Sequence, residues 1–417
     1  MTLVILNRSI SRKSLPSLPP EIWENVLYSL DESYSTSELE DEGFWKRAYK
    51  TLAACSRTCR FWHIVAQRSL YRHIRLFYSS TWFNIKVLTH SLWLFRKNVS
   101  FIRSLFIRFP VFDKSTYATG WSIPLFPNIL PNVTLLKLQH MDMAKVHSDF
   151  LRTLACLPSL RHLVLEGSTI KIRVLQRIIF SLKDLQHLDL INMEFLWTEA
   201  QFLSTECSIH RCSLQTIGLY AEWHGAQAAS CTGILQWLAC NPGISQTVRV
   251  LDIHIFQTTD ETILALDKVL MVCGLSLEYC RLAISWTTKC SIDFQHNPNL
   301  KDLALKYIGP TDLSAADEIQ TNISSWVLPL VSSIHSSNVA IHIERFVDIV
   351  ECCGALEASL NMTGVSKLRQ VRVLLEERGG KNLVRWIGLF PVLVEQKRLF
   401  LCQEFRESWK SLFMADR

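Results

Sequence analysis

The chain has 417 residues, of which 48% are hydrophobic and 20% are charged, and its formal net charge is +6. This length leaves room for two or three domains, and the composition is that of an ordinary globular protein. The 44 basic side chains are dispersed among 38 acidic ones rather than gathered in a stripe. Because nucleic-acid binding relies on concentrated positive charge, we expect no nucleic-acid partner.

Cysteine usage and hydropathy predict an intracellular location. The 13 cysteines are odd in number and occupy apolar positions, which favours reduced thiols in the cytoplasm or nucleus over a disulfide framework. The most apolar window, 269–286, contains Glu278 and Arg281, so we expect no membrane-spanning helix. Residues 1–14, ahead of the first predicted helix, are expected to form a disordered tail.

The first predicted helix begins at Pro19 and Pro20. Proline suits the first turn of a helix, because the N–H that it lacks would have no partner there. Glu21 and Glu24 follow in the same turn, where the helix dipole favours negative charge. The apolar face of this segment consists of Ile22, Val26, Leu27 and Leu30. The sequence therefore predicts an amphipathic helix.

A second apolar series follows an acidic stretch at about residues 31–43, which we interpret as a solvated insertion. The members of this series recur at spacings of about three or four: Leu52, Cys55, Cys59, Trp62, Val65, Ala66 and Leu70. Such spacing predicts a second amphipathic helix that packs with the first. Residues 76–96 are predicted to form a helical linker to the rest of the chain.

The order of these segments resembles an F-box, the helical module through which substrate receptors of cullin-type ubiquitin ligases bind a Skp-family adaptor. The resemblance covers residues 15–75 and rests on Leu18-Pro19-Pro20-Glu21-Ile22, then Leu52 and the run from Cys55 to Trp62. It implies an adaptor contact made by Leu18, Pro19, Ile22, Val26, Leu27, Leu52, Cys59 and Trp62. Two features depart from the family: Thr58 stands where Val is usual at a core position, and the 31–43 insertion is long. An unrelated helical hairpin is the alternative.

After residue 97 the chain repeats one pattern, in which apolar residues occupy the first, fourth and sixth positions of a hexad. The best copy consists of Leu185, Leu188 and Leu190. Eight clear copies begin at Ile102, Val133, Leu160, Leu185, Leu214, Val248, Leu277 and Leu300, and weaker ones lie near Ile341 and Leu368. The pattern resembles a degenerate leucine-rich repeat array that covers residues 97–376.

Each hexad is predicted to form a strand, because its fourth and sixth positions are two apart and point to one side of an extended chain. The segments between copies are predicted to be helical at 150–157, 174–182, 234–238 and 262–270. The result is an α/β fold: a small N-terminal helical F-box, then an irregular leucine-rich-repeat solenoid with parallel strands on the concave side and helices outside. Residues 377–417 are predicted to be a helical C-terminal cap. An ordinary α/β sheet domain is the alternative.

The residues between the apolar hexad positions are predicted to point away from the core. In the central column of the sheet these are Lys137, Val164, Asp189, Gly218, Asp252, Arg281 and Ala304. A mixture of charge with His and Tyr suits protein recognition. We therefore expect a candidate substrate surface of His162, Glu166, His187, Asp189, Tyr220, Asp252, His254, Tyr279 and Arg281. A solvated sheet face without a partner is the alternative.

No catalytic motif competes with a binding function. The sequence lacks a glycine-rich phosphate loop and the common hydrolase and zinc-protease motifs, and Cys207, His210 and Cys212 match no common zinc spacing. We expect no catalytic residue, metal or cofactor. An F-box followed by leucine-rich repeats resembles the substrate receptors of SCF-type ubiquitin ligases, especially the fungal families with degenerate repeats. It implies a non-catalytic subunit that binds a Skp-family adaptor, through it a cullin, and an unidentified protein substrate. A repeat scaffold outside ubiquitination is the alternative.

Overall fold

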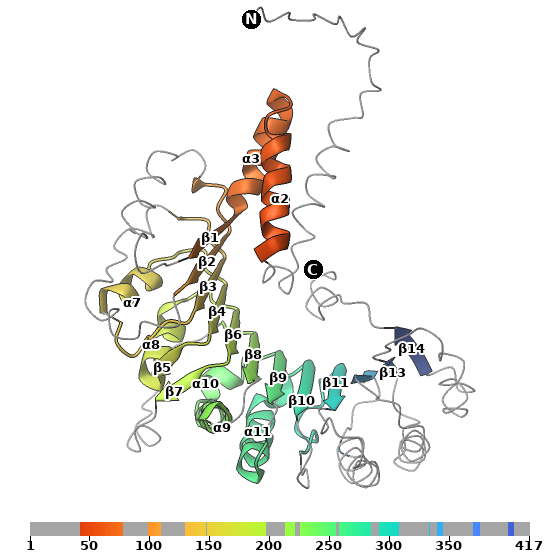
Figure 1. The fold of residues 1–417 in the computed structure, drawn as a ribbon. Helices are drawn as coiled ribbons and strands as arrows, with labels where there is room; N and C mark the ends of the chain where they lie inside the picture. The colour runs from red at the N-terminus through yellow and green to blue at the C-terminus, as the bar shows by residue number, and fades with distance from the viewer. Residues whose placement is uncertain are drawn as a thin grey trace, which may run out of the picture. The chain divides into compact units, whose positions relative to one another are not determined.

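A computed structural model describes residues 42–77, 99–109, 130–146, 148–196, 213–221, 226–255, 258–284, 292–307, 333, 340–344, 370–375 and 399–403. These residues belong to two compact units, which divide between Arg72 and His73. Figure 1 shows their helices and strands. The predicted tail (1–14), the first predicted helix and nearly all of the predicted linker lie outside the described residues.

The first unit contains two helices, α2 (Glu42–Cys55) and α3 (Arg60–Arg72). A single helix was predicted across this region, but a turn at residues 56–59 divides it. The hydroxyls of Ser56 and Thr58 each donate, over 2.8 Å, to a carbonyl in the last turn of α2. Such local bonds satisfy the final carbonyls of a helix and compete with its continuation. Thr58 is exposed, so its predicted core position was wrong.

A small apolar core holds these two helices together. Leu52 of α2 and Val65 of α3 are each only 2% exposed. Cys55, Phe61 and Leu70 pack around them as partly buried neighbours. The apolar series along the chain therefore does form a shared core, although two helices supply it instead of one.

The second unit is built on a sheet of twelve strands, all of whose pairs are parallel. The strands are β1 (His73–Phe77), β2 (Ser104–Arg108), β3 (Leu135–Gln139), β4 (His162–Glu166), β6 (His187–Ile191), β8 (Thr216–Ala221), β9 (Val250–Ile255), β10 (Tyr279–Ile284), β11 (Asp302–Tyr307), β12 (Ala340–Glu344), β13 (Gln370–Leu375) and β14 (Leu399–Gln403). They lie side by side in chain order (Figure 1). A doubly wound α/β sheet differs, because its strand order reverses at a switch point.

The predicted hexads all form strands of this sheet, from β2 to β13. The sheet also extends past both predicted limits of the repeats. β1 lies before residue 97, and β14 lies within the 377–417 segment that was predicted to be a helical cap. In β14 the alternation Leu399, Leu401 follows the strand period, and its register aligns these leucines with Val371 and Val373 of β13. The apolar and aromatic residues around it concealed this period of two in the sequence.

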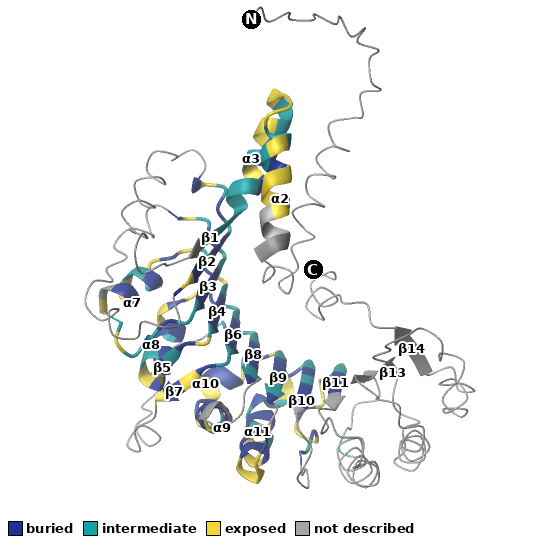
Figure 2. Cartoon of the chain, in the orientation of Figure 1, coloured by how far each residue is buried: buried dark blue, intermediate teal, exposed yellow. Residues whose placement is uncertain are grey.

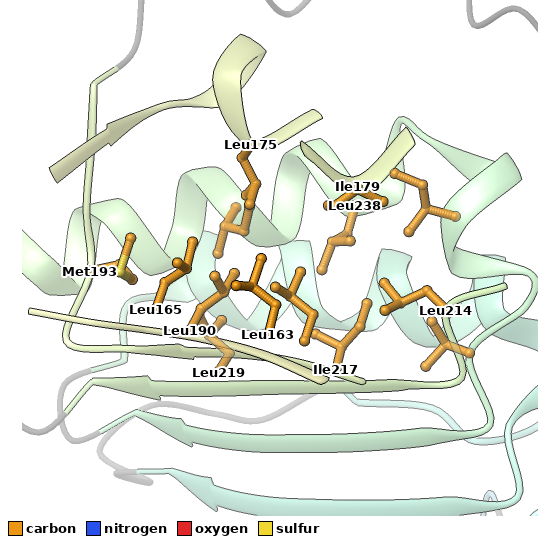
Figure 3. Close-up of a cluster of buried hydrophobic side chains, with 14 of the residues drawn as sticks. Leu163, Leu165, Leu175, Ile179, Leu190, Met193, Leu214, Ile217, Leu219 and Leu238 are labelled. Atoms are coloured by element: carbon orange, nitrogen blue, oxygen red, sulfur yellow. The ribbon is translucent and has the colours of Figure 1, made fainter. Parts of the chain in front are cut away.

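Helices cover one face of the sheet, at or near the positions predicted. They are α7 (Ser148–Ala155), α8 (Ile172–Ser181), α9 (Ala226–Ala239), the short α10 (Pro242–Ser245), α11 (Asp260–Cys273) and the 3-10 turn η4 (Gly274–Ser276). Figure 3 shows strand residues such as Leu163, Leu165 and Leu190 pointing toward helix residues such as Leu175 and Leu238. Each of these five side chains is at most 3% exposed, so the core lies between sheet and helices. A two-stranded parallel sheet, β5 (Thr169–Lys171) with β7 (Glu194–Leu196), accompanies α8.

In six of the eight clear copies, the polar residue directly before the hexad ties it to the preceding copy. The side chains at this position donate hydrogen bonds to backbone carbonyls of the copy before: Asn132, Ser159, Ser213, Thr247, Ser276 and Asn299. Their donor–acceptor distances lie between 2.6 and 3.0 Å. In these copies the repeated pattern is therefore longer than the apolar hexad by one hydrogen-bonding residue, which apolar spacing alone does not reveal.

Three consecutive strands end in the same left-handed backbone conformation. His140, Gly167 and Asn192 follow β3, β4 and β6 and have φ values of 60°, 55° and 50°. The N–H of each donates to a carbonyl at the C-terminal end of the next sheet strand, over 2.7–2.8 Å: those of Glu166, Ile191 and Tyr220. Glycine and asparagine adopt this conformation more readily than most residues. These bonds fix the register at the C-terminal ends of the strands.

Candidate functional site

The sheet face opposite the helices carries the predicted substrate surface, and we call it the polar face. Because side chains alternate along a strand, the residues between the buried leucines point to this face. Strand register aligns Asp189, Gly218 and Asp252 across β6, β8 and β9. Their neighbours Val164 and Arg281 continue the same column on β4 and β10. The predicted orientation of the central column is therefore correct.

The central column is less exposed than the alternative, a solvated sheet face, implies. Asp189 is 2% exposed, and Lys137 and Asp252 are each 8% exposed. Figure 2 shows that the residues of these strands are mostly buried or half-buried. Burying charge is costly unless each charge is paired, so the contacts of these residues decide what the face can do.

The first charged group lies across β3 and β4. Lys137 Nζ is 2.6 Å from Glu166 Oε2, and the Gln139 amide donates to the same oxygen over 2.8 Å. Burial raises the pKa of the Glu166 carboxyl, but the Lys137 ammonium and the Gln139 amide outweigh burial and hold the pKa below its usual value. Glu166 is therefore ionised and fixed in place at neutral pH.

The second group joins β4 and β6. His162 Nε2 lies 2.8 Å from Asp189 Oδ2, although register places His162 beside His187 rather than beside Asp189. The contact is thus diagonal, a reach that a long side chain can make between adjacent strands. The His162 and His187 rings lie 5.5 Å apart at a tilt of 58°. Both predicted histidines therefore belong to one cluster with the buried Asp189.

The third group is centred on Asp252 of β9. Tyr220 donates its hydroxyl to Asp252 Oδ2 over 2.5 Å, and His254 Nε2 lies 3.0 Å from Asp252 Oδ1. Burial raises the pKa of Asp252, but His254, Arg281 and the Tyr220 hydrogen bond outweigh burial and lower the pKa below its usual value. Burial and the Asp252 carboxylate raise the pKa of Tyr220 well above its usual value. A carboxylate and a neutral phenol are the stable forms of this pair.

Gly218 makes room for the Tyr220 ring. A Cβ at Gly218 would collide with Asp189 Oδ1 and would approach the Tyr220 ring. The absence of a side chain at this one position of the central column lets Tyr220 lie over the backbone and reach Asp252. Gly218 belongs to the predicted central column but not to the predicted substrate surface.

Tyr279 lies apart from the three buried groups, in a more exposed cluster at the start of β10. Lys301 Nζ is 5.8 Å from the centre of the Tyr279 ring and 2.6 Å from Glu278 Oε2. The structure thus places the predicted residues in three buried polar groups and one peripheral cluster. In the described ranges, no three His, Cys, Asp or Glu residues are close enough to hold a metal ion together. Cys207, His210 and Cys212 lie outside those ranges.

The predicted adaptor-binding residues divide between described and undescribed parts of the chain. Leu18, Pro19, Ile22, Val26 and Leu27 lie outside the described residues. Leu52 is buried in the core between α2 and α3, whereas Cys59 is exposed and Trp62 is half-buried. Of these three, only Cys59 and Trp62 have surface available to a partner.

Comparison with known proteins does not assign the chain. No protein-family model and no curated protein matches it.

The described helices and cysteines provide two further observations. None of the helices in the described parts of the chain is long and apolar enough to cross a membrane. The seven cysteines with described side chains are all free thiols, and burial raises the pKa of Cys231 and Cys273 to about 12.

Gly218→Ala is expected to lower the free energy of unfolding by about 1–3 kcal/mol, because the added methyl overpacks the space under Tyr220. Gly243→Ala is the matched control, since a Cβ there meets no atom within 4 Å. Urea unfolding of both variants beside the wild type measures the difference. Equal stability of the Gly218 and Gly243 variants would show that the Tyr220 ring does not depend on this gap.

Proposed function

We propose that this chain is the substrate-receptor subunit of a cullin-type SCF ubiquitin ligase. In this proposal the F-box at residues 15–75 docks on a Skp-family adaptor, and leucine-rich repeats hold a protein substrate on the polar face. The protein itself catalyses nothing and works in the cytoplasm or nucleus. Its contribution to the reaction is to bring a substrate close to the ubiquitin-transferring subunits.

The order of the twelve strands is the strongest support for the repeat part of the proposal. Stacked repeats that each contribute one strand produce a parallel sheet in chain order, and this is the order of β1 to β14. The polar residue before the hexad recurs in six of the eight clear copies, where it bonds the copy to the copy before it. Repeat arrays use such extended sheet faces to bind other macromolecules.

The polar face favours recognition over chemistry. Its carboxylates at positions 166, 189 and 252 already contact Lys137, His162, His254 or Tyr220. A general acid or base needs a free path to its substrate, whereas these groups hold one another in place. A preorganised face loses little side-chain entropy when a partner binds, which favours tight association.

The surface of α2 and α3 supports the docking part of the proposal. Ile64 of α3 is 53% exposed, and Tyr49 of α2 is 48% exposed. Cys59, directly before α3, is also exposed. These side chains are available to a partner that docks on the two helices. Leu18 and Pro19, outside the described residues, match the F-box motif in sequence.

Replacing Leu18 and Pro19 together by Ala is expected to weaken adaptor binding about a hundredfold or more, since each lost hot-spot contact costs about 1–3 kcal/mol. The sequence offers a matched control three residues upstream, Leu15→Ala/Pro16→Ala, which repeats the same Leu-Pro dipeptide outside the motif. Each variant is co-expressed with a Skp-family adaptor, and complex yield and calorimetric affinity are measured. Wild-type affinity in a soluble Leu18/Pro19 variant would refute the docking assignment and favour a scaffold outside ubiquitination.

A further inference from the structure

Helix α8 carries charge that opposes its own dipole. Its N-cap is Lys171, whose side chain makes no capping hydrogen bond, and no acidic residue occupies its first turn. Arg173 adds a second positive charge in that turn. The positive end of a helix dipole favours acidic side chains and disfavours basic ones. This arrangement therefore does not serve the stability of α8.

Helix α11 shows that the same chain follows the usual rule elsewhere. Thr259 caps α11, accepts a hydrogen bond from the Thr262 N–H, and forms a capping box with the Thr262 side chain. Asp260 and Glu261 occupy its first turn. Both helices connect neighbouring strands of the same sheet, so they have the same structural role. Helix α3 also begins with a basic residue, Arg60, and has no acid in its first turn. What distinguishes α8 is that exposed cations continue from Lys171 past its last turn to Lys183.

Four exposed cations lie along α8 and at its two ends, and we call this set the α8 basic face. It consists of Lys171, Arg173, Arg177 and Lys183, all of which are exposed. Arg173 and Arg177 are four residues apart and lie on one side of the helix, where like charges repel. None of the four forms an ion pair with another residue in the described ranges. Two acids are close in the described sequence: Asp184 follows Lys183, and Glu194 of β7 accepts a hydrogen bond from Thr169.

We propose that the α8 basic face binds an acidic segment of a partner protein, at a site separate from the polar face. Four cations within thirteen residues complement a short run of Asp and Glu side chains. Leu196 of β7 is 38% exposed and pairs in register with Lys171, so it adds a small apolar contact at one end. The proposal is independent of the F-box assignment.

The structure favours a protein partner over a bilayer or a nucleic acid. The apolar side of α8, formed by Ile172, Leu175, Ile178 and Ile179, is buried in the core and cannot insert into a membrane. Single-stranded nucleic acids are held by exposed aromatic rings, and Phe180, the aromatic residue of α8, packs partly buried against the core. A short acidic peptide needs neither feature.

Fluorescence anisotropy with a labelled ten-residue oligoglutamate probe tests the proposal on the full chain. Arg173→Gln/Arg177→Gln is expected to weaken binding about tenfold or more, and salt should weaken wild-type binding because both partners are exposed. Arg108→Gln/Lys268→Gln is the matched control, since it removes two other exposed cations and changes net charge equally. This control should bind the probe as tightly as the wild type.

Stability separates a binding role from a structural one. Arg173→Glu should raise the melting temperature, because it replaces a cation by an anion in the first turn of α8. The same variant should no longer bind the oligoglutamate probe. Equal loss of binding in both double variants would overturn the proposal. So would binding that is confined to an oligouridylate of ten nucleotides or to phosphatidylserine vesicles, which serve as the nucleic-acid and membrane comparisons.

Discussion

Leu188→Ala is expected to lower the free energy of unfolding by about 2–5 kcal/mol, the range for emptying a fully buried leucine site. Leu188 is 2% exposed and points from β6 into the core between sheet and helices. Its register partners Leu163 and Ile217 are equally buried, so the surrounding strands offer little freedom to close the cavity. The loss should therefore lie toward the upper part of the range.

Ile191→Ala is the matched control for this substitution. It removes an aliphatic side chain from the same strand, but Ile191 is half-buried on the polar face. Chemical denaturation of both variants should show a clearly larger loss for Leu188. Equal losses would contradict the division of β6 into a core side and a polar side.

Asp252→Ala is expected to lower the free energy of unfolding by about 3–5 kcal/mol, because it disrupts a buried charged group and leaves its partners without their contact. The substitution leaves the Tyr220 hydroxyl without its acceptor at 2.5 Å and His254 without its contact at 3.0 Å. Asp184→Ala, at an exposed site, should change stability by no more than about 0.5 kcal/mol. Denaturation of both variants at pH 7 measures the contrast.

The stability difference between wild type and Asp252→Ala should depend on pH. The pKa of Asp252 is lower in the folded protein than its usual value, so its stabilising effect is fully present above the pKa of the unfolded chain, about 3.9. That effect is lost as pH falls through the folded-state pKa. The stability gap between wild type and Asp252→Ala should therefore narrow below about pH 4. A gap that widens on acidification would contradict the ionised, paired state of Asp252.

The strands and the core were largely predictable from local sequence. An apolar residue at alternate positions, as in Leu188 and Leu190, can point to only one side of a strand, and burial of both agrees with that constraint. The prediction of a single second helix failed, because apolar spacing gave no sign of its break. The break between α2 and α3 depends on side-chain bonds of Ser56 and Thr58 to the backbone, which a count of apolar spacing does not register.

The polar face shows a different limit of sequence reasoning. The alternation correctly identified which residues point outward, but not that Asp189 and Asp252 would be buried there. Their burial depends on diagonal contacts from His162 and Tyr220, and on the gap at Gly218. Such contacts join strands about 27–32 residues apart, so no local pattern reveals them.

Affinity capture of the full chain from cell extract, followed by mass spectrometry, tests the proposed function most directly. A substrate receptor should recover a Skp-family adaptor and a cullin together, and the Leu18/Pro19 double variant should recover neither while Leu15→Ala/Pro16→Ala recovers both. Recovery of the folded wild-type chain without an adaptor would contradict the proposed role in ubiquitin ligation.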